Sequence, residues 1–267
     1  MRVRGLQALI FDVDGTLADT EELHREAFNT AFRSFDLPWN WDAALYGRLL
    51  QVTGGKERIA RYIDELPILE SERARLKGRV PDLHAAKTRF YRQLIGLGRV
   101  RPRAGVRRLM LEALEAGVRL GIASTTSPEN VEPLIRAAFG QATLSWFATI
   151  ATGDIVQHKK PAPDIYNVAV AELTVPASGA VAVEDSAIGV ESAKRAGLFA
   201  VAVPCRWTRT QDFSSADLVL DSLGEPDHPL DEASARRLGA RYLSLEHLAA
   251  LHGASLSDRR RGDGRST

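Results

Sequence analysis

Cysteine is nearly absent from this chain of 267 residues, in which Cys205 stands alone. A single cysteine excludes an internal disulfide framework and any metal site built from several thiolates. The chain also has no run of ~18 apolar residues, so we expect no transmembrane helix and no membrane partner. Its first residues are basic but lack the apolar segment of a secretory signal peptide, which favours a cytoplasmic protein.

Excess charge of one sign is absent too. The 35 Lys and Arg residues nearly balance the 34 Asp and Glu residues, which gives a net charge of +1. This balance provides no electrostatic reason to expect nucleic-acid binding, and we expect a monomer. Apolar residues make up 45% of the chain, which is enough for one large domain or two modest ones.

Short apolar runs alternate with helical periodicity along most of the chain. This alternation predicts an α/β fold with a Rossmann-like parallel sheet covered by helices on both faces. We expect the strands of this core at 6–11, 118–123, 147–151, 179–183, 199–203 and 217–220. We expect its helices at 106–116, 131–139, 164–173, 188–196 and 243–251.

The segment between about residues 19 and 98 has no strand signal. Its apolar residues follow a helical period at 21–35, where Asp19 and Glu22 resemble an N-terminal cap. The sequence therefore predicts an α-helical cap domain at 19–98, inserted into a core made of 1–18 and 99–255. We expect further cap helices at 59–63 and 83–97, with a polar stretch between them.

The end of the chain, 256–267, has a different composition. Within it, residues 257–267 carry four arginines, two aspartates and no apolar residue that could anchor them to a core. Because such a segment cannot bury enough apolar surface to offset the entropy of ordering, we expect it to be disordered.

Polar groups follow successive predicted strands, and parallel sheets bind ligands beyond the carboxyl ends of their strands. Asp12 and Asp14 come after the first strand, and two carboxylates spaced in this way can point to the same side. One of them can attack phosphorus as a nucleophile, and the other can give a proton to the leaving oxygen. A pair of loop carboxylates that only stabilises a turn is the structural alternative.

Three further groups follow later strands in the order needed for phosphate chemistry. The Ser124 hydroxyl and the backbone amides after it can hold phosphate oxygens, and the Lys160 ammonium can balance the charge. Asp12, the backbone carbonyl of Asp14 and Asp185 suit Mg²⁺, which takes few protein carboxylates. Each group also has a structural alternative. Ser124 and Asp185 could cap helices, and Lys160 could be a solvated surface lysine, although the neighbouring Lys159 fits that description better. Their joint occurrence favours catalysis.

Taken together, these motifs resemble those of the haloacid dehalogenase superfamily of aspartate-dependent phosphotransferases. Asp12-Val13-Asp14-Gly15-Thr16 is similar to the first motif, with Asp12 as nucleophile and Asp14 as acid/base. Ser124 is similar to the second motif, Lys160 to the third, and Glu184-Asp185 to the fourth. The resemblance implies a Rossmann-like core with a helical cap after strand one. It also implies a Mg²⁺ cofactor held by Asp12, Asp14, Glu184 and Asp185.

Segments of the cap region narrow the resemblance to the β-phosphoglucomutase-like branch and, within it, to the CbbY-type phosphatases. These segments are Asp19–His24, Thr53–Ile59 and His84–Lys87. CbbY-type enzymes remove phosphate from xylulose 1,5-bisphosphate, an inhibitor of Rubisco. The resemblance implies a phosphosugar substrate and substrate contacts from Glu21, His24, Gly54, Gly55, Lys56, Glu57, Arg58, His84, Lys87, Ser124, Thr125, Thr126 and Asn130.

Charge and helix geometry agree with parts of this expectation. Lys56, Arg58 and Lys87 can supply cations for a phosphate distant from the metal, although they can equally be solvated charges of a helix face. Thr20 and His24 lie one helical turn apart and share a face. For His24, packing within the cap is as good an explanation as a role at the site.

Three other functions remain open from the residues alone. A phosphomutase of the β-phosphoglucomutase type uses the same four core motifs and returns the phosphoryl group to a sugar instead of water. Another small phosphosugar could also be the substrate of a phosphatase. A sugar-phosphate sensor without activity could have lost a nucleophile, acid, lysine or metal ligand, yet all four are present.

Overall fold

The computed structural model describes residues 5–153 and 155–263. Six strands of this part form one parallel sheet in the order β3-β2-β1-β4-β5-β6. Its centre is β1, where Phe11 is in register with Ile122 on one side and Val183 on the other. The strands are β1 (Ala8–Phe11), β2 (Arg119–Ser124), β3 (Phe147–Thr152), β4 (Ala180–Glu184), β5 (Phe199–Ala202) and β6 (Leu218–Val219).

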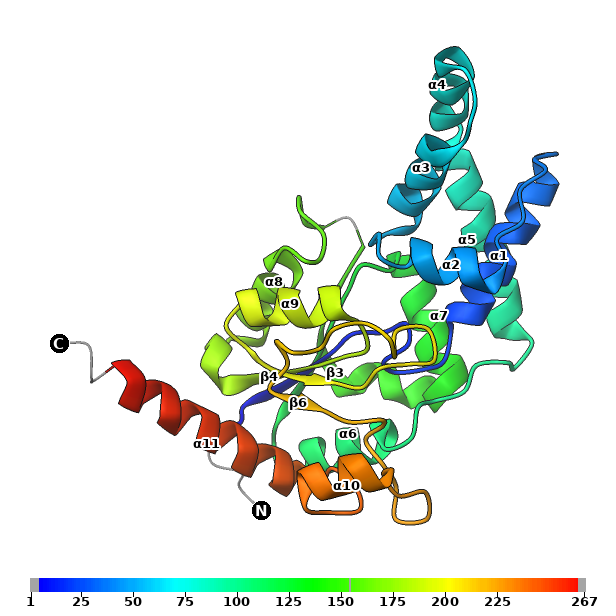
Figure 1. Cartoon of the computed structure of the whole chain (residues 1–267). Coiled ribbons are helices and arrows are strands. Elements are labelled where there is room, and N and C mark those ends of the chain that lie inside the picture. Colours follow the sequence, from blue (N-terminus) through cyan, green and yellow to red (C-terminus); the bar gives the residue numbers. More distant parts are fainter. Residues whose placement is uncertain (1–4, 154, 264–267) are drawn as a thin grey trace.

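Helices cover both faces of this sheet (Figure 1). Side chains of α8 (Asp164–Leu173) and α9 (Ala187–Arg195) pack with one set of strand residues, while α6 (Val106–Glu115) and α7 (Pro128–Phe139) pack with the other. Further along the chain are α10 (Glu232–Leu238) and α11 (Leu245–Asp263). This confirms the predicted α/β core.

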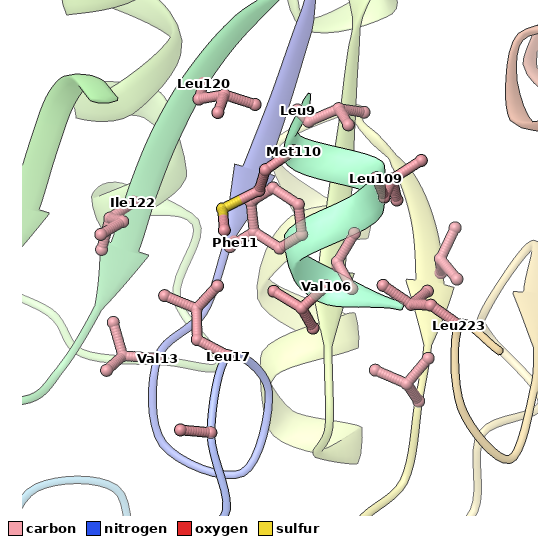
Figure 2. Close-up of a cluster of buried hydrophobic side chains, with 14 of the residues drawn as sticks. Leu9, Phe11, Val13, Leu17, Val106, Leu109, Met110, Leu120, Ile122 and Leu223 are labelled. Atoms are coloured by element: carbon pink, nitrogen blue, oxygen red, sulfur yellow. The ribbon is translucent and has the colours of Figure 1, made fainter. Parts of the chain in front are cut away.

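Successive residues of a strand point to opposite faces of the sheet and therefore belong to different clusters. In β1, Leu9 and Phe11 belong to the cluster under α6, whereas Ala8 and Ile10 belong to the cluster under α8 and α9. Figure 2 shows Phe11 and Met110 in the first cluster, with Leu17 of the loop after β1 drawn below them. This buried packing anchors the loop that carries Asp12 and Asp14.

Five helices lie between β1 and α6, in the region where the sequence predicts a cap (Figure 1). Their own core is aromatic: Phe28, Phe32, Trp39, Trp41 and Tyr46 are all buried together. The helices are α1 (Glu21–Ser34), α2 (Ala43–Leu49), α3 (Gly55–Glu65), α4 (Glu70–Gly78) and α5 (Val80–Gly96).

Several local predictions need correction. The N-cap of α1 is Thr20, without a side-chain cap bond, so Asp19 and Glu22 form no capping box; the Thr20 hydroxyl donates to Asp14 instead. The polar stretch expected between two cap helices is the short helix α4, in which Arg73 and Arg75 pair with glutamates one turn away.

The expected disorder of 256–267 is also wrong for residues 256–263, because α11 runs on to Asp263. Leu245 and Leu248, near the start of α11, are buried in the core and anchor the helix, which then continues by propagation from an existing turn. Residues 264–267 lie outside the described part. No helix in the described ranges combines the length and apolar character that crossing a membrane requires.

Candidate active site

The carboxyl ends of β1 and β4 bring three carboxylates together. Asp12 follows β1 directly, and its backbone N–H donates to the carbonyl of Val183 in β4. Glu184 ends β4 and Asp185 follows it. Among the described residues, Asp12, Glu184 and Asp185 each offer an oxygen within 4.8 Å of the others, and all three are buried. Such a donor set can hold a metal ion.

Lys160 crosses to this cluster from the loop after β3. Its Nζ donates to Asp12 Oδ1 at 2.7 Å, to Glu184 Oε1 at 2.6 Å and to the carbonyl oxygen of Ala123 at 2.9 Å. Tyr166 of α8 donates its hydroxyl to the same Glu184 oxygen at 2.6 Å. We call Asp12, Lys160, Glu184 and Asp185 the core cluster.

One ammonium does not balance three buried carboxylates. Burial raises the pKa of Asp12 to about 7, although Lys160 acts in the opposite direction. The pKa of Asp185 is raised well above its usual value by burial, and next by the charges of Asp12 and Glu184. Burial would lower the pKa of Lys160, but the carboxylates of Asp12 and Glu184 outweigh burial and raise this pKa. A divalent cation would relieve this excess negative charge, so the residues present fit a metal.

Gly15 lets the loop after β1 lie against Asp185. Its φ is +81°, in the left-handed region that glycine adopts at little cost. A Cβ at this position would lie 2.7 Å from Asp185 Cγ and closer still to a carboxylate oxygen. The glycine of the first motif is therefore required both by its backbone conformation and by close approach.

Asp14 points away from the core cluster and toward the cap. Its Oδ1 accepts from Thr20 at 2.6 Å, from His24 Nε2 at 2.8 Å and from the Tyr91 hydroxyl at 3.2 Å. The Thr126 hydroxyl donates to Oδ2. Burial alone would raise the pKa of Asp14, but its electrostatic interaction with His24 and the hydrogen bonds from His24, Thr126 and Thr20 outweigh burial and lower it. Asp14 is thus held as a carboxylate, the form of a base.

His24 connects Asp14 to a buried lysine. Lys87 Nζ lies 2.6 Å from His24 Nδ1, and the His24 ring stacks on Tyr91 with a centroid distance of 3.8 Å. When Lys87 is protonated it donates to Nδ1, which leaves Nε2–H to donate to Asp14. Burial lowers the pKa of Lys87 to about 8. His24 therefore does more than pack within the cap, because it hydrogen-bonds to both Asp14 and Lys87.

A cavity of about 100 Å³ lies between the cap and the core, and it brings together most of the predicted residues. Thr125 and Ser127 line it from the core loop, and Thr53 and Leu50 from the cap. The predicted residues that line it are Asp12, Asp14, Glu21, His24, Gly54, Gly55, Arg58, His84, Lys87, Ser124, Thr125, Thr126, Asn130, Lys160 and Asp185.

Three predicted residues do not line this cavity. Glu184 lies behind it, fully buried against Lys160 and Tyr166. Lys56 lines a neighbouring groove. Glu57 accepts from Lys159 Nζ at 2.7 Å, an ion pair that joins α3 to the core. The interpretation of Lys159 as a plain solvated lysine is therefore wrong, since its side chain is 18% exposed and paired across the two regions.

Two tyrosines at the site give no signal in the sequence, because their contacts are with distant elements. Tyr91 reaches Asp14 across 77 positions of the chain, and Tyr166 reaches Glu184 from a different element. Both tyrosines follow the apolar period of their helices, so nothing in the sequence separates them from core residues. For Thr20 the sequence gives a weak indication of a place at the site, since Thr20 shares a helix face with His24.

Comparison with known proteins places the chain among phosphate-processing enzymes. A profile described as haloacid dehalogenase-like hydrolase matches residues 6–197. Protein CbbY of Cereibacter sphaeroides is 47% identical over 220 residues, which cover 82% of this chain and 94% of that protein. Protein CbbY, plasmid, of Cupriavidus necator is 41% identical, covering 94% of this chain and 98% of that protein.

Solved structures agree with this relationship. The crystal structure of a CbbY mutant from Rhodobacter sphaeroides, in complex with xylulose-(1,5)bisphosphate, has a TM-score of 0.75 and 45% identity, covering 81% of this chain and 94% of that chain. A β-phosphoglucomutase from Clostridium difficile has a TM-score of 0.69 at 19% identity, covering 94% and 99%, and shows the shared fold. The chain belongs to the haloacid dehalogenase-like hydrolase family.

Proposed function

We propose that this protein is a Mg²⁺-dependent phosphatase that removes phosphate from a sugar bisphosphate, xylulose 1,5-bisphosphate. One observation carries the proposal: Asp12, Asp14, Lys160 and Asp185 line the same cavity as the cationic cap residues Arg58 and Lys87. The relative crystallised with xylulose-(1,5)bisphosphate, 45% identical, supports this choice of substrate.

Asp12 is the proposed nucleophile. Its carboxylate attacks phosphorus, an aspartyl-phosphate forms, and the bond from phosphorus to the sugar oxygen breaks. Lys160, 2.7 Å from Asp12 Oδ1, keeps this carboxylate oriented and balances the charge that spreads over the transferring group. A Mg²⁺ ion held by Asp12, Asp185 and the Asp14 carbonyl, with Glu184 behind them, would supply further neutralisation of phosphate charge.

Asp14 is the proposed acid and base. The acid step requires Asp14 to take up a proton when substrate binds, and Asp14 then gives this proton to the departing sugar oxygen. As the base, the carboxylate that remains takes a proton from water. That water attacks phosphorus, the bond to Asp12 breaks, and inorganic phosphate leaves. The four donors around Asp14 favour its carboxylate form, which is the form needed to activate water.

The cap residues are proposed to recognise the rest of the substrate. Arg58 and Lys87 lie on α3 and α5, across the cavity from the core cluster, where the second phosphate of a bisphosphate needs positive charge. The cavity is smaller than the ~300–1,000 Å³ of pockets that hold small-molecule ligands. We infer that the cap moves away from the core to admit substrate and then excludes water when it returns.

Phosphate release from xylulose 1,5-bisphosphate in the presence of Mg²⁺ tests this proposal. Asp12→Asn serves as the blank, because it keeps the shape of the side chain and removes the nucleophile. We expect rapid release that EDTA abolishes. The rate for the blank should be lower by about 10³-fold or more. Release no faster than the blank would refute the substrate. Conversion of β-glucose 1-phosphate to glucose 6-phosphate would instead identify a phosphomutase.

A further inference from the structure

Tyr46 of α2 lies beside the cavity without lining it. Its side chain is fully buried in the aromatic core of the cap, with its ring 6.3 Å from that of Phe28 and 6.2 Å from that of Trp41. Packing alone would be satisfied by phenylalanine at this position. The hydroxyl group therefore needs an explanation of its own, since burying it without partners would cost free energy.

That hydroxyl joins two residues of the cavity wall. It donates to Glu21 Oε2 at 2.5 Å, and it accepts from Arg58 Nη1 at 3.2 Å. Glu21 belongs to α1 and Arg58 to α3, and both line the cavity. Burial, with the nearby charge of Glu21, raises the pKa of Tyr46 well above its usual value, so the phenol keeps the proton that it donates.

Neutral partners hold the Arg58 guanidinium in place. Its Nε donates to the carbonyl of Leu49 at 3.2 Å and its Nη2 to that of Val52 at 3.3 Å. The guanidinium also lies over the Tyr46 ring, 5.4 Å from the ring centroid. Carbonyls and rings orient a guanidinium without neutralising it, so Arg58 keeps its positive charge for an anionic ligand.

We propose that Tyr46 is a positioning residue for substrate selection, because its hydroxyl fixes the Glu21 carboxylate and the Arg58 guanidinium relative to each other. Glu21 then accepts from a sugar hydroxyl while Arg58 contacts the second phosphate of the substrate. This inference rests on the proposed phosphatase function and goes beyond it by assigning the selection of bisphosphates over monophosphates to a buried group that does not touch substrate.

A loop of the core also packs against the Tyr46 ring. Trp207, in the loop after β5, packs edge-on against Tyr46 with ring centroids 5.3 Å apart. The next residue, Thr208, donates its hydroxyl to the backbone carbonyl of Asp185 at 2.6 Å. One short loop therefore contacts both a proposed metal ligand and the residue that orders the cap wall.

The test is Tyr46→Phe, with Tyr62→Phe as the matched control. Tyr62 packs against the same aromatic cluster, where its ring lies 5.4 Å from that of Trp41. The hydrogen bonds to Glu21 and Arg58 in the described structure come from Tyr46 instead. We compare kcat/KM for xylulose 1,5-bisphosphate, for the xylulose monophosphates and for p-nitrophenyl phosphate. The last compound lacks both a sugar hydroxyl and a second phosphate.

We expect Tyr46→Phe to lower the preference for bisphosphate over monophosphate about tenfold, mainly through KM, because a charge-assisted hydrogen bond is lost. Turnover of p-nitrophenyl phosphate should stay within about twofold of wild type. Adding Tyr46→Phe to Arg58→Met should change the preference little further, since the hydroxyl affects the second phosphate only through that guanidinium.

Two results would overturn the inference: an unchanged preference in Tyr46→Phe, or an equal loss on all three substrates, which marks a purely structural role. A wild-type enzyme that turns over p-nitrophenyl phosphate but not xylulose 1,5-bisphosphate would refute the proposed substrate instead. The same variants are then compared on fructose 1,6-bisphosphate and fructose 6-phosphate, where the preference tests Tyr46 independently of that substrate.

Discussion

The core cluster and the cap side of the cavity are built in different ways. The core cluster stands on strand ends, where the backbone is fixed by a parallel ladder of hydrogen bonds. The cap side stands on helices α1, α2, α3 and α5, which contact one another through side chains such as Tyr46 and Lys87. The core side is rich in carboxylates, whereas the cap side presents Arg58, Lys87 and His24.

This contrast separates chemistry from recognition. Carboxylates at strand ends can hold a cation and attack phosphorus, and their positions tolerate little change because the sheet sets them. Cationic and aromatic side chains on helices surround the rest of a ligand, and they depend on where the cap lies. Asp14 belongs to both regions, since the core loop carries it and the cap supplies three of its four donors.

Removing the group shared by the two regions should have the largest effect. Asp14→Asn keeps the shape of the side chain but cannot exchange a proton, so we expect kcat to fall by about 10²–10⁴-fold. Steady-state phosphate release measures this loss. Asp19→Asn is the control, because Asp19 is an exposed carboxylate in the same loop. An equal loss in the control would contradict an acid/base role for Asp14.

Gly15→Ala tests how rigidly the core cluster is set. The added Cβ would meet Asp185 and would require a left-handed backbone, so we expect destabilisation of about 1–2 kcal/mol and a rate loss of about 10²-fold. Urea unfolding and kcat/KM measure the two effects. Gly117→Ala separates them, because Gly117 has φ +75° and no atom within 4 Å of its Cβ position. It should lose stability alone, and activity loss there would contradict the close-approach argument.

Lys87→Met tests the cost of burying charge in the cap. The pKa of Lys87 is about 8 when folded and 10.5 ordinarily, so between these values the unfolded chain binds more protons. The free energy of unfolding should therefore rise from pH 8 to 10.5, by up to about 3 kcal/mol from this group.

Denaturant unfolding of wild type and Lys87→Met at several pH values checks this rise, which the variant should lack. Lys77→Met provides the control, since Lys77 is a half-exposed cap lysine paired with Asp64. A rise that persists in Lys87→Met would assign the pH dependence to another group.

The smallest effect is expected from the ion pair that joins the cap to the core. Glu57→Gln removes the charge that Lys159 contacts across the two regions, and an exposed pair contributes about 0.2–1 kcal/mol. We expect KM to rise about two- to fivefold at low salt and the difference to shrink at high salt. Glu65→Gln breaks pairs that lie within the cap. An equal change in KM there would exclude a role in cap closure.

Much of the core could be predicted because its signals are local. An apolar run followed by a carboxylate identifies a strand end, and parallel strands necessarily bring their ends to one edge. Asp12, Lys160 and Asp185 were therefore found together from sequence. The cap residues were predicted only through resemblance, and that resemblance also included Lys56 and Glu57, which do not line the cavity.

The sequence by itself determined the alternating α/β order, the helical insert and the groups that follow each strand, because hydrophobic periodicity and glycine at a turn act over a few residues. Only the tertiary structure decided which side chains meet across the cap and core: Tyr91 with Asp14, Tyr46 with Glu21 and Arg58, and Glu57 with Lys159. These contacts join residues far apart in the chain, and their geometry follows from how whole helices pack.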